Sequence, residues 1–244
     1  MHAVARLRDA RLARSSKPFA ARGGSRQPHC PGCRLIPSHC ICAQRRQLHT
    51  RAGVCLLMHD IEPLKPSNTG WLVADVVADT FAFGWARTSA DPALLALLAD
   101  PQWQPCVVFP QEYADAARVV DGGWLEPRAA GPAEAAAPRP LLVLLDGTWS
   151  QARKMFHKSP YLDRLPVLGL QGALSHYLLR RARQPGHLCT AEVAALCLQL
   201  AGDGAAAAQL DGWLQRYSRR YWQAKEQRPA CDDDLPVPPP GDPT

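Results

Sequence analysis

A carboxylate, a hydroxyl and an indole follow directly after an apolar run in the middle of the chain. The run is Leu141 to Leu145, and Asp146-Gly147-Thr148-Trp149 comes next. Ligands of α/β proteins bind at the carboxyl ends of buried strands, where an aspartate can take a proton from a substrate. The structural alternative is that Asp146 or Ser150 caps the following helix and Trp149 fills a gap. Asp146, Thr148 and Trp149 are therefore candidate functional residues.

Four cysteines lie close together near the N-terminus. Cys30-Pro-Gly-Cys33 is followed after six residues by Cys40-Ile-Cys42. Four thiolates at such spacing are typical of a closed, tetrahedral structural Zn²⁺ site, with Cys30, Cys33, Cys40 and Cys42 as ligands. Because the Cys40-x-Cys42 pair is short, His29 or His39 is an alternative ligand, and free or redox-active cysteines are the other interpretation. The cysteines in apolar runs are expected in the core instead: Cys55, Cys106, Cys189 and Cys197.

Two further polar segments carry residues that suit a binding site. Met58-His59 opens a loop with two prolines that ends at Thr69-Gly70. Ser175 to Arg180 leads into Cys189-Thr190-Ala191-Glu192, where the free amides of a helix N-terminus can bind a carboxylate. Each segment alone is a weak signal. The chain has no G-x-G-x-x-G or P-loop motif, which counts against dinucleotide and nucleoside triphosphate binding.

Short apolar runs indicate the sheet that must position these residues. Several runs are continuous, as in parallel strands that are buried on both faces. Helical patterns separate them, and Asp91-Pro92, Thr190 and Gly202 are helix start and stop signals. This alternation predicts an α/β layered, mostly parallel sheet with flanking helices. The expected strands are 54–58, 81–85, 106–109, 141–145 and 165–170, and the expected helices begin near 93, 150 and 190, with a last aromatic-striped helix around 210–221.

The two ends of the chain differ in composition from this core. Residues 1–51 carry eleven Lys and Arg but a single acid, Asp9, whereas the remainder is net negative. Such a positive segment favours a polyanion as partner, and the alternative is a solvated basic tail without one. We expect residues 1–27 to be a mostly disordered basic tail, 229–244 a disordered Pro/Asp tail, and 126–140 an insertion loop.

We expect neither a membrane-spanning helix nor a secretory signal in this sequence. The apolar runs are far shorter than the roughly 20 residues of a spanning helix, and the arginine-rich N-terminus has no apolar signal region. We therefore expect a cytoplasmic protein, and no feature predicts a protein partner.

Taken together, these segments resemble the DTW domain family of tRNA-uridine aminocarboxypropyltransferases. The family motif D-x-T-W matches Asp146-Gly147-Thr148-Trp149. The resemblance covers roughly residues 28–225, and several motifs in the right order make it far more specific than one motif. Cys189 departs from the pattern, since relatives carry Ser before the Thr-x-Glu turn. The other similar segments are Gln151 to Met155, Met58-His59 with Glu62 and Lys65, Thr69-Gly70, Ser175-x-Tyr177-x-x-Arg180, Thr190-Ala191-Glu192 and the four-cysteine knuckle.

The resemblance implies a knuckle at 28–46 and a SPOUT-like catalytic domain at 47–228. The implied reaction transfers the 3-amino-3-carboxypropyl group of S-adenosyl-L-methionine to N3 of a tRNA uridine, at position 47 of the variable loop, and releases methylthioadenosine. Asp146 would act as general base. The implied cofactor-binding residues are Met58, Thr148, Trp149, Tyr177, Thr190, Ala191 and Glu192, and the expected tRNA phosphate contacts are Arg34, Arg45, Arg46, Arg153 and Lys154.

Two other functions stay open from the sequence. A SPOUT-type RNA methyltransferase would share the fold and S-adenosylmethionine but deliver the methyl carbon. A zinc-knuckle RNA-binding protein without catalysis would use Asp146 only as a helix cap.

Overall fold

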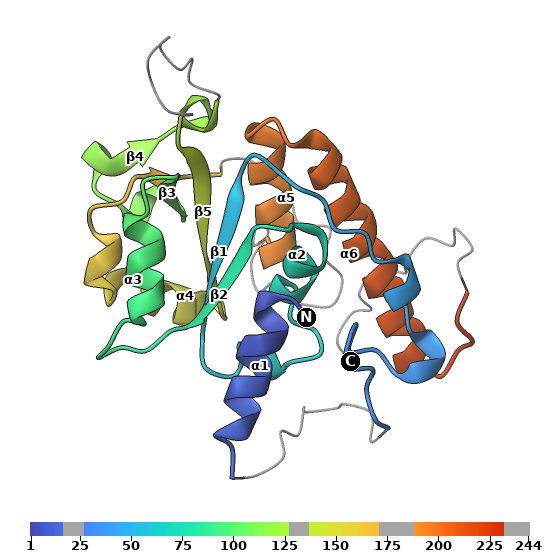
Figure 1. Ribbon diagram of the computed structural model, residues 1–244. Coiled ribbons are helices and arrows are strands. Elements are labelled where there is room, and N and C mark those ends of the chain that lie inside the picture. The colour runs from blue at the N-terminus through green and yellow to red at the C-terminus, as the bar shows by residue number, and fades with distance from the viewer. Residues whose placement is uncertain (17–26, 127–136, 171–187, 232–244) are drawn as a thin grey trace.

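A six-stranded sheet forms the centre of the computed structural model, which describes residues 1–16, 27–126, 137–170 and 188–231 (Figure 1). The strand order is β2-β1-β5-β3-β6-β4, and each of these neighbouring pairs is parallel. The predicted α/β class with a parallel sheet is thus confirmed. The strands are Gly53–Met58 (β1), Thr80–Gly84 (β2), Trp103–Val108 (β3), Val119–Val120 (β4), Arg139–Asp146 (β5) and Val167–Leu168 (β6).

Helices cover both faces of the sheet, which explains why its central strands are continuously apolar. Side chains of β1 alternate between two clusters: Val54 and Leu56 pack on one face, Cys55 and Leu57 on the other. All six residues of β1 are buried. Five strands lie where the sequence predicted them, although β6 has only two residues. β4 was not predicted, because two valines carry too little pattern to identify a strand.

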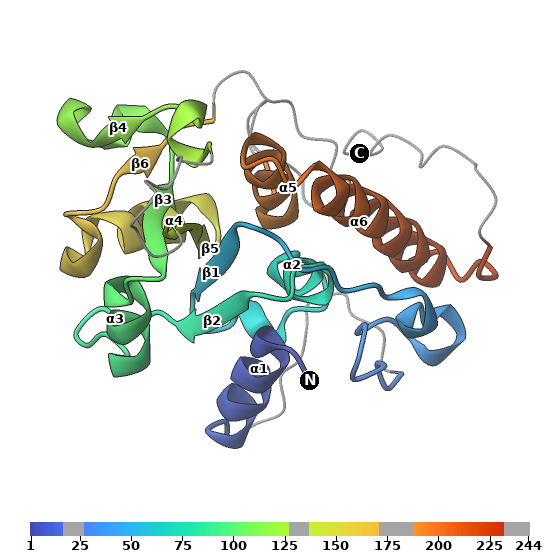
Figure 2. The ribbon, with the colours of Figure 1, turned by 45° about the horizontal axis from the view of Figure 1, so that its top comes forward.

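The helices divide between these two faces (Figures 1 and 2). Ala3–Ala13 (α1), Gly70–Val76 (α2), Thr190–Leu200 (α5) and Gly204–Lys225 (α6) lie on one side, and Pro92–Ala99 (α3) and Trp149–His157 (α4) lie on the other. The short 3₁₀ helices are Pro37–His39 (η1), Cys42–Gln44 (η2), Glu62–Leu64 (η3), Gln111–Tyr113 (η4), Ala116–Arg118 (η5), Gly122–Leu125 (η6) and Pro160–Leu162 (η7).

Helix ends follow local sequence signals in two of three expected places. Asp91 caps α3 by accepting from the amide of Ala93 at 2.8 Å, and Gly202 ends α5 with a φ of +84°, a conformation that favours glycine. The expectation that Thr190 caps α5 is wrong. Cys189 holds the N-cap position there, and the Glu192 side chain accepts its amide N–H at 2.7 Å. The Thr190 hydroxyl is free for another contact.

The N-terminal segment corrects the expectation of a mostly disordered basic tail. Residues 3–13 form α1, which packs against β2, η3 and α2. His2 caps the helix, and Val4 is fully buried. The buried residues of α1 are small apolar ones in its first turn, which pack on the neighbouring elements. The sequence therefore shows no sustained apolar period along this helix. Residues 17–26 lie outside the described part, as do 127–136 of the expected insertion loop and 232–244 of the expected C-terminal tail.

The connections of β1 and β5 leave the sheet in opposite directions. β1 leads through α2 to β2 on one side, whereas β5 leads through α4 to β6 on the other. The two strands are neighbours, with Met58 paired to Asp146 at their carboxyl ends. Such a topological switch point is where open α/β sheets bind ligands. Asp146 therefore ends its strand at the position where a site is expected.

Candidate functional site at the carboxyl ends of two central strands

The Asp146 side chain joins three segments that are distant in sequence. It is fully buried, and its Oδ2 accepts from Asn68 Nδ2 at 2.7 Å. Its Oδ1 accepts from the Thr190 hydroxyl at 2.8 Å. The end of β5, the loop before α2 and the N-terminus of α5 therefore meet at one carboxylate. Thr190, one of the expected cofactor-binding residues, thus contacts Asp146 directly.

The loop between β1 and α2 brings a second carboxylate into the same network. Glu62 is buried, and its Oε1 lies 2.5 Å from Lys65 Nζ. Its Oε2 accepts from Asn68 Nδ2 at 3.4 Å. Asn68 thus donates toward both acids, while its Oδ1 accepts the Trp71 amide N–H at 3.2 Å. One amide thus bridges two buried acids, and an ammonium group pairs with one of them, an arrangement that costs more to build than apolar packing.

Sequence reasoning missed Asn68 as a site residue. The Asn-Thr-Gly turn was a signal, but such turns are common in exposed loops. What singles out Asn68 is burial and its contact with Asp146, and both depend on tertiary packing.

Gly70, the first residue of α2, packs directly on the Asp146 carboxylate. A Cβ built on this glycine would lie 2.7 Å from Asp146 Oδ2. Carbon and oxygen atoms do not approach so closely without displacement, so the glycine permits the close approach of the helix. Next to it, the Thr69 hydroxyl accepts the Ala191 amide N–H at 3.4 Å.

The N-terminus of α5 is already engaged by protein groups at two amides. Ala191 N–H donates to Thr69, and Cys189 N–H donates to Glu192. Because both amides have internal acceptors, the expected carboxylate-binding role cannot rest on them in this conformation. Ala191 is fully buried and Glu192 nearly so.

Thr148 and Trp149 lie at the start of α4 on the other face of the sheet. The exposed Thr148 is the N-cap, and Gln151 Oε1 accepts its amide N–H at 2.8 Å in a capping box. Trp149 stacks on Phe109, with ring centroids 5.5 Å apart and an interplanar angle of 9°, and meets Tyr113 edge-on. Trp149 therefore packs among aromatic rings, as the structural alternative expected. The helix cap, however, is Thr148 and not Asp146 or Ser150.

Met58 and Tyr177 are the remaining predicted cofactor residues. Met58 is fully buried in the core cluster on the α2 face, and its carbonyl oxygen accepts the Trp85 amide N–H. Tyr177 lies outside the described residues, as do Ser175 and Arg180.

The structure corrects the expectation that Arg34 contacts tRNA phosphates. Its side chain is buried and donates to the backbone carbonyls of Pro63, Pro66 and Asn68, so its N–H groups are not available to an RNA phosphate in this conformation. Arg45 is partly committed too, since its guanidinium lies 3.0 Å from the buried Asp75 carboxylate. The remaining expected contacts are exposed: Arg46, Arg153 and Lys154.

The four N-terminal cysteines form a cluster with the geometry of a metal site. Their sulfur atoms all lie within 4.8 Å of one another. The Cys30–Cys42 and Cys30–Cys40 separations are 3.6 Å, and Cys33–Cys40 is 3.8 Å. Zn–S bonds of about 2.3 Å in a tetrahedron require S–S separations of about 3.8 Å. The residues thus fit a tetrahedral metal ion, whereas His29 and His39 bond to the Arg34 and Arg228 carbonyls and are not part of the cluster.

The cluster also has the electrostatics that a cation would relieve. Burial opposes ionisation of Cys30, but hydrogen bonds from the Cys33 and Gly32 amides and from neighbouring thiols outweigh it and lower its pKa to about 7. Burial and neighbouring thiolates raise the pKa of Cys33 to about 11. Cys33 therefore favours the neutral thiol at neutral pH, and a bound cation would favour its thiolate.

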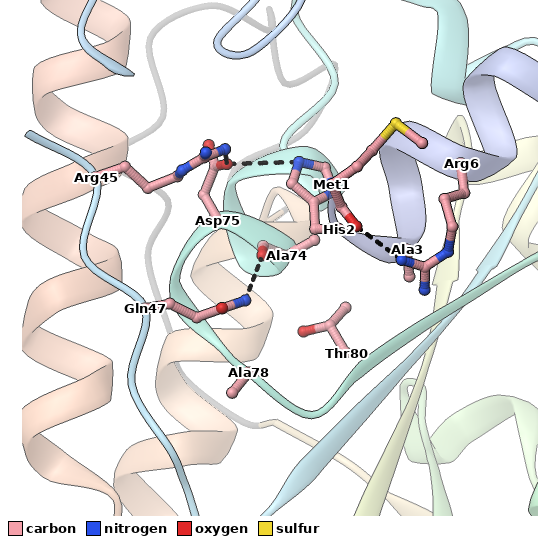
Figure 3. A pocket seen from close by; sticks show the side chains of 10 residues that line it. All are labelled: Met1, His2, Ala3, Arg6, Arg45, Gln47, Ala74, Asp75, Ala78 and Thr80. Atoms are coloured by element: carbon pink, nitrogen blue, oxygen red, sulfur yellow. Dashed lines mark hydrogen bonds and ion pairs between the residues drawn. The ribbon is translucent and has the colours of Figure 1, made fainter. Parts of the chain in front are cut away.

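A cavity of about 350 Å³ lies elsewhere, between the start of α1 and the residues that precede β2 (Figure 3). Its polar centre is Asp75, which faces Arg45 and lies 3.4 Å from His2 Nε2. Burial and nearby arginines lower the pKa of His2 to about 3, so the imidazole is neutral at physiological pH. The cavity also contacts Thr80, at the amino end of β2, so it lies toward the opposite edge of the sheet from Asp146.

Comparison with known proteins decides the family. The DTW domain model matches residues 27–222. The chain belongs to the DTW domain family. It is also similar to tRNA-uridine aminocarboxypropyltransferase 2 of Drosophila melanogaster, with 45% identity over 58 residues. That match spans 23% of this chain and 23% of the relative's length. No solved structure matches.

The match places both the cysteine cluster and Asp146 inside the DTW domain. It begins before Cys30 and extends into α6. In the described residues of this domain, no helix is both long and apolar enough to cross a membrane.

The DTW protein is expected to bind one Zn²⁺ per chain. Purified chain should carry one equivalent by elemental analysis, and Cys33→Ser should lose it, because Cys33 is the most buried ligand. Lowering the pH should release the metal as protons compete for the thiolates. Cys231→Ser is the matched control, since Cys231 is outside the cluster. Equal metal content in both variants would rule out the four-cysteine site.

Proposed function

We propose that this DTW protein is a tRNA-uridine aminocarboxypropyltransferase that uses S-adenosyl-L-methionine. Uridine N3 would form a bond to the Cγ carbon of the 3-amino-3-carboxypropyl group while the bond from that carbon to sulfur breaks. The sulfur keeps the electron pair and leaves as methylthioadenosine, and the N3 proton passes to a base. The variable-loop uridine at position 47 is the proposed target.

The observation that carries the proposal is the convergence of family segments on one carboxylate. Residues of the Glu62–Gly70 loop, the D-x-T-W motif and the Thr190–Glu192 turn meet at Asp146, at a topological switch point. The similar Drosophila protein is named for the same reaction class, which supports the choice of reaction.

Asp146 is the proposed base, with Asn68 and Thr190 fixing the direction of its two oxygens. Because Asp146 is fully buried in this conformation, access of the uracil would require the surrounding loops to move apart. Such conformational steps are common in enzymes that exclude water.

The cofactor would lie across the carboxyl ends of β1 and β5. Met58 and the Thr190–Glu192 turn would line this position from the α2 face. Thr148 and Trp149 would line it from the start of α4, where an indole face can attract the positively charged sulfonium. Tyr177 is proposed to complete the pocket.

Exposed basic residues are the proposed contacts to tRNA phosphates. Arg46 lies beyond the cysteine cluster, and Arg153 and Lys154 project from α4, near the carboxyl ends of the strands. Contacts of this kind give an affinity that falls steeply with salt concentration. Zn²⁺ would be structural, because four thiolates leave no open coordination position.

Mass spectrometry of nucleosides tests the proposal directly. Unmodified tRNA incubated with the protein and S-adenosylmethionine should gain about 101 mass units on one uridine, with methylthioadenosine released. A gain of about 14 mass units would identify a methyltransferase instead. Binding of tRNA without any mass change would favour a non-catalytic RNA-binding protein.

A further inference from the structure

Arg34 connects the cysteine cluster to the loop that precedes α2. Its backbone has a φ of +65°, which is uncommon for a residue with a side chain. The turn that carries Cys30 and Cys33 imposes it: Arg34 N–H donates to the Cys30 carbonyl at 2.8 Å, and Cys30 N–H donates to the Leu35 carbonyl at 2.7 Å. The conformation of the metal-binding turn therefore sets the direction of the Arg34 side chain.

The Arg34 guanidinium lies inside the loop that leads to Asn68. Its Nη1 donates to the Pro63 carbonyl at 3.1 Å. Its Nη2 donates to the Pro66 carbonyl at 2.7 Å and to the Asn68 carbonyl at 3.3 Å. One side chain thus fixes three points of the Glu62–Asn68 loop, a geometry that suits the planar fork of arginine and not the single ammonium of lysine.

Trp71 closes the connection from the other side. The Arg34 guanidinium lies over the Trp71 ring, 4.4 Å from the centroid. The indole Nε1 of Trp71 donates to the Gly32 carbonyl at 2.9 Å. Tyr217 of α6 adds a hydrogen bond to the Pro66 carbonyl. The cysteine turn, the loop and the first turn of α2 are therefore one packed unit.

Asn68, the last residue of this loop, contacts the Asp146 carboxylate directly. Asn68 accepts from Arg34 through its backbone carbonyl and donates to Asp146 through its side chain. A shift of the loop relative to the cysteine turn would move the Asn68 amide, and with it a hydrogen bond that orients Asp146. Displacements of about 1 Å at such a position can cost about 10² in rate.

We infer that Arg34 is a positioning residue through which the metal-bound cysteine turn fixes the Glu62–Asn68 loop, and hence Asn68, against Asp146. The effect on rate rests on the proposed function, whereas the effect on the loop does not. The cysteine cluster then has a purpose beyond local stability, because the loop that it holds belongs to the Asp146 site.

Arg34→Met tests the role of the side chain, with Arg34→Lys as the conservative variant. Arg164→Met, at an exposed arginine outside the proposed binding residues, is the matched control. Hydrogen exchange of the peptide spanning 62–71 should be at least about tenfold faster in Arg34→Met than in wild type, while the β5 peptide is unchanged. The turnover number should fall about 10–100-fold with little change in KM for tRNA, and Arg34→Lys should recover part of it. A purely structural role would lower the amount of folded protein but leave the turnover of the folded fraction intact, and that result would overturn the inference.

Metal removal provides the second arm and needs no substrate. Chelation of the full-length wild type should speed exchange of the 62–71 peptide more than exchange of β5, and should add little in Arg34→Met, because the same connection is already broken. Equal acceleration of both peptides would mean that the metal holds the whole fold and not this loop. Failure of aminocarboxypropyl transfer would leave these exchange results interpretable, so the two proposals can fail separately.

Discussion

Asp146→Asn is expected to lower kcat/KM for aminocarboxypropyl transfer by about 10²–10⁴-fold while the protein stays folded. The amide has nearly the shape of the carboxylate. Its oxygen can still accept from Asn68, and its NH₂ can donate to Thr190, whose hydroxyl serves as donor or acceptor. The substitution therefore removes the charge and the proton acceptor but keeps the network. The initial rate of methylthioadenosine release measures the loss.

Two companion variants make this result decisive. Asp163→Asn removes an exposed carboxylate and should leave the rate unchanged. Asp146→Ala removes the network as well as the charge. If Asp146→Asn keeps the wild-type rate while Asp146→Ala loses it, Asp146 orients its neighbours and the base lies elsewhere.

Gly70→Ala is expected to reduce the turnover number by about 10²-fold and to destabilise the fold by about 1–3 kcal/mol. The new Cβ would lie 2.7 Å from Asp146 Oδ2 and 3.3 Å from Asn68 Oδ1. Neither atom belongs to a flexible side-chain end, because both acceptors are buried in the network. Either the carboxylate or α2 must move, and both movements disturb the site. Thermal unfolding and the rate of methylthioadenosine release measure the two effects.

Gly212→Ala provides the matched control in another helix. A Cβ built there has nothing within 4 Å, so the substitution in α6 should stabilise the protein by about 0.5–1 kcal/mol through helix propensity alone. Activity should not change. If Gly70→Ala behaves like Gly212→Ala in both measurements, close packing of α2 on Asp146 is not required.

The sequence by itself determined the features that depend on neighbouring residues. Continuous apolar runs predicted five strands because both faces of the central sheet are covered, and the Asp91 cap and the Gly202 stop follow from local backbone chemistry. The four-cysteine cluster was equally local, since its ligands span a short segment. The position of Asp146 at a strand end also followed, because a buried strand must end where polar residues begin.

Only the tertiary structure decided which side chains meet at Asp146 and which polar side chains are buried. In the sequence, Arg34 is one of several arginines in a basic segment. In the fold it is buried, because three loop carbonyls and an indole ring take the place of the water that would solvate its guanidinium. The α1 helix forms because β2 and α2 supply an apolar surface that its own sequence does not reveal. Asn68 and Gly70 acquire their roles from contacts across 76 or more positions of the chain. Local patterns cannot encode such pairings, because they depend on how the connections cross the sheet.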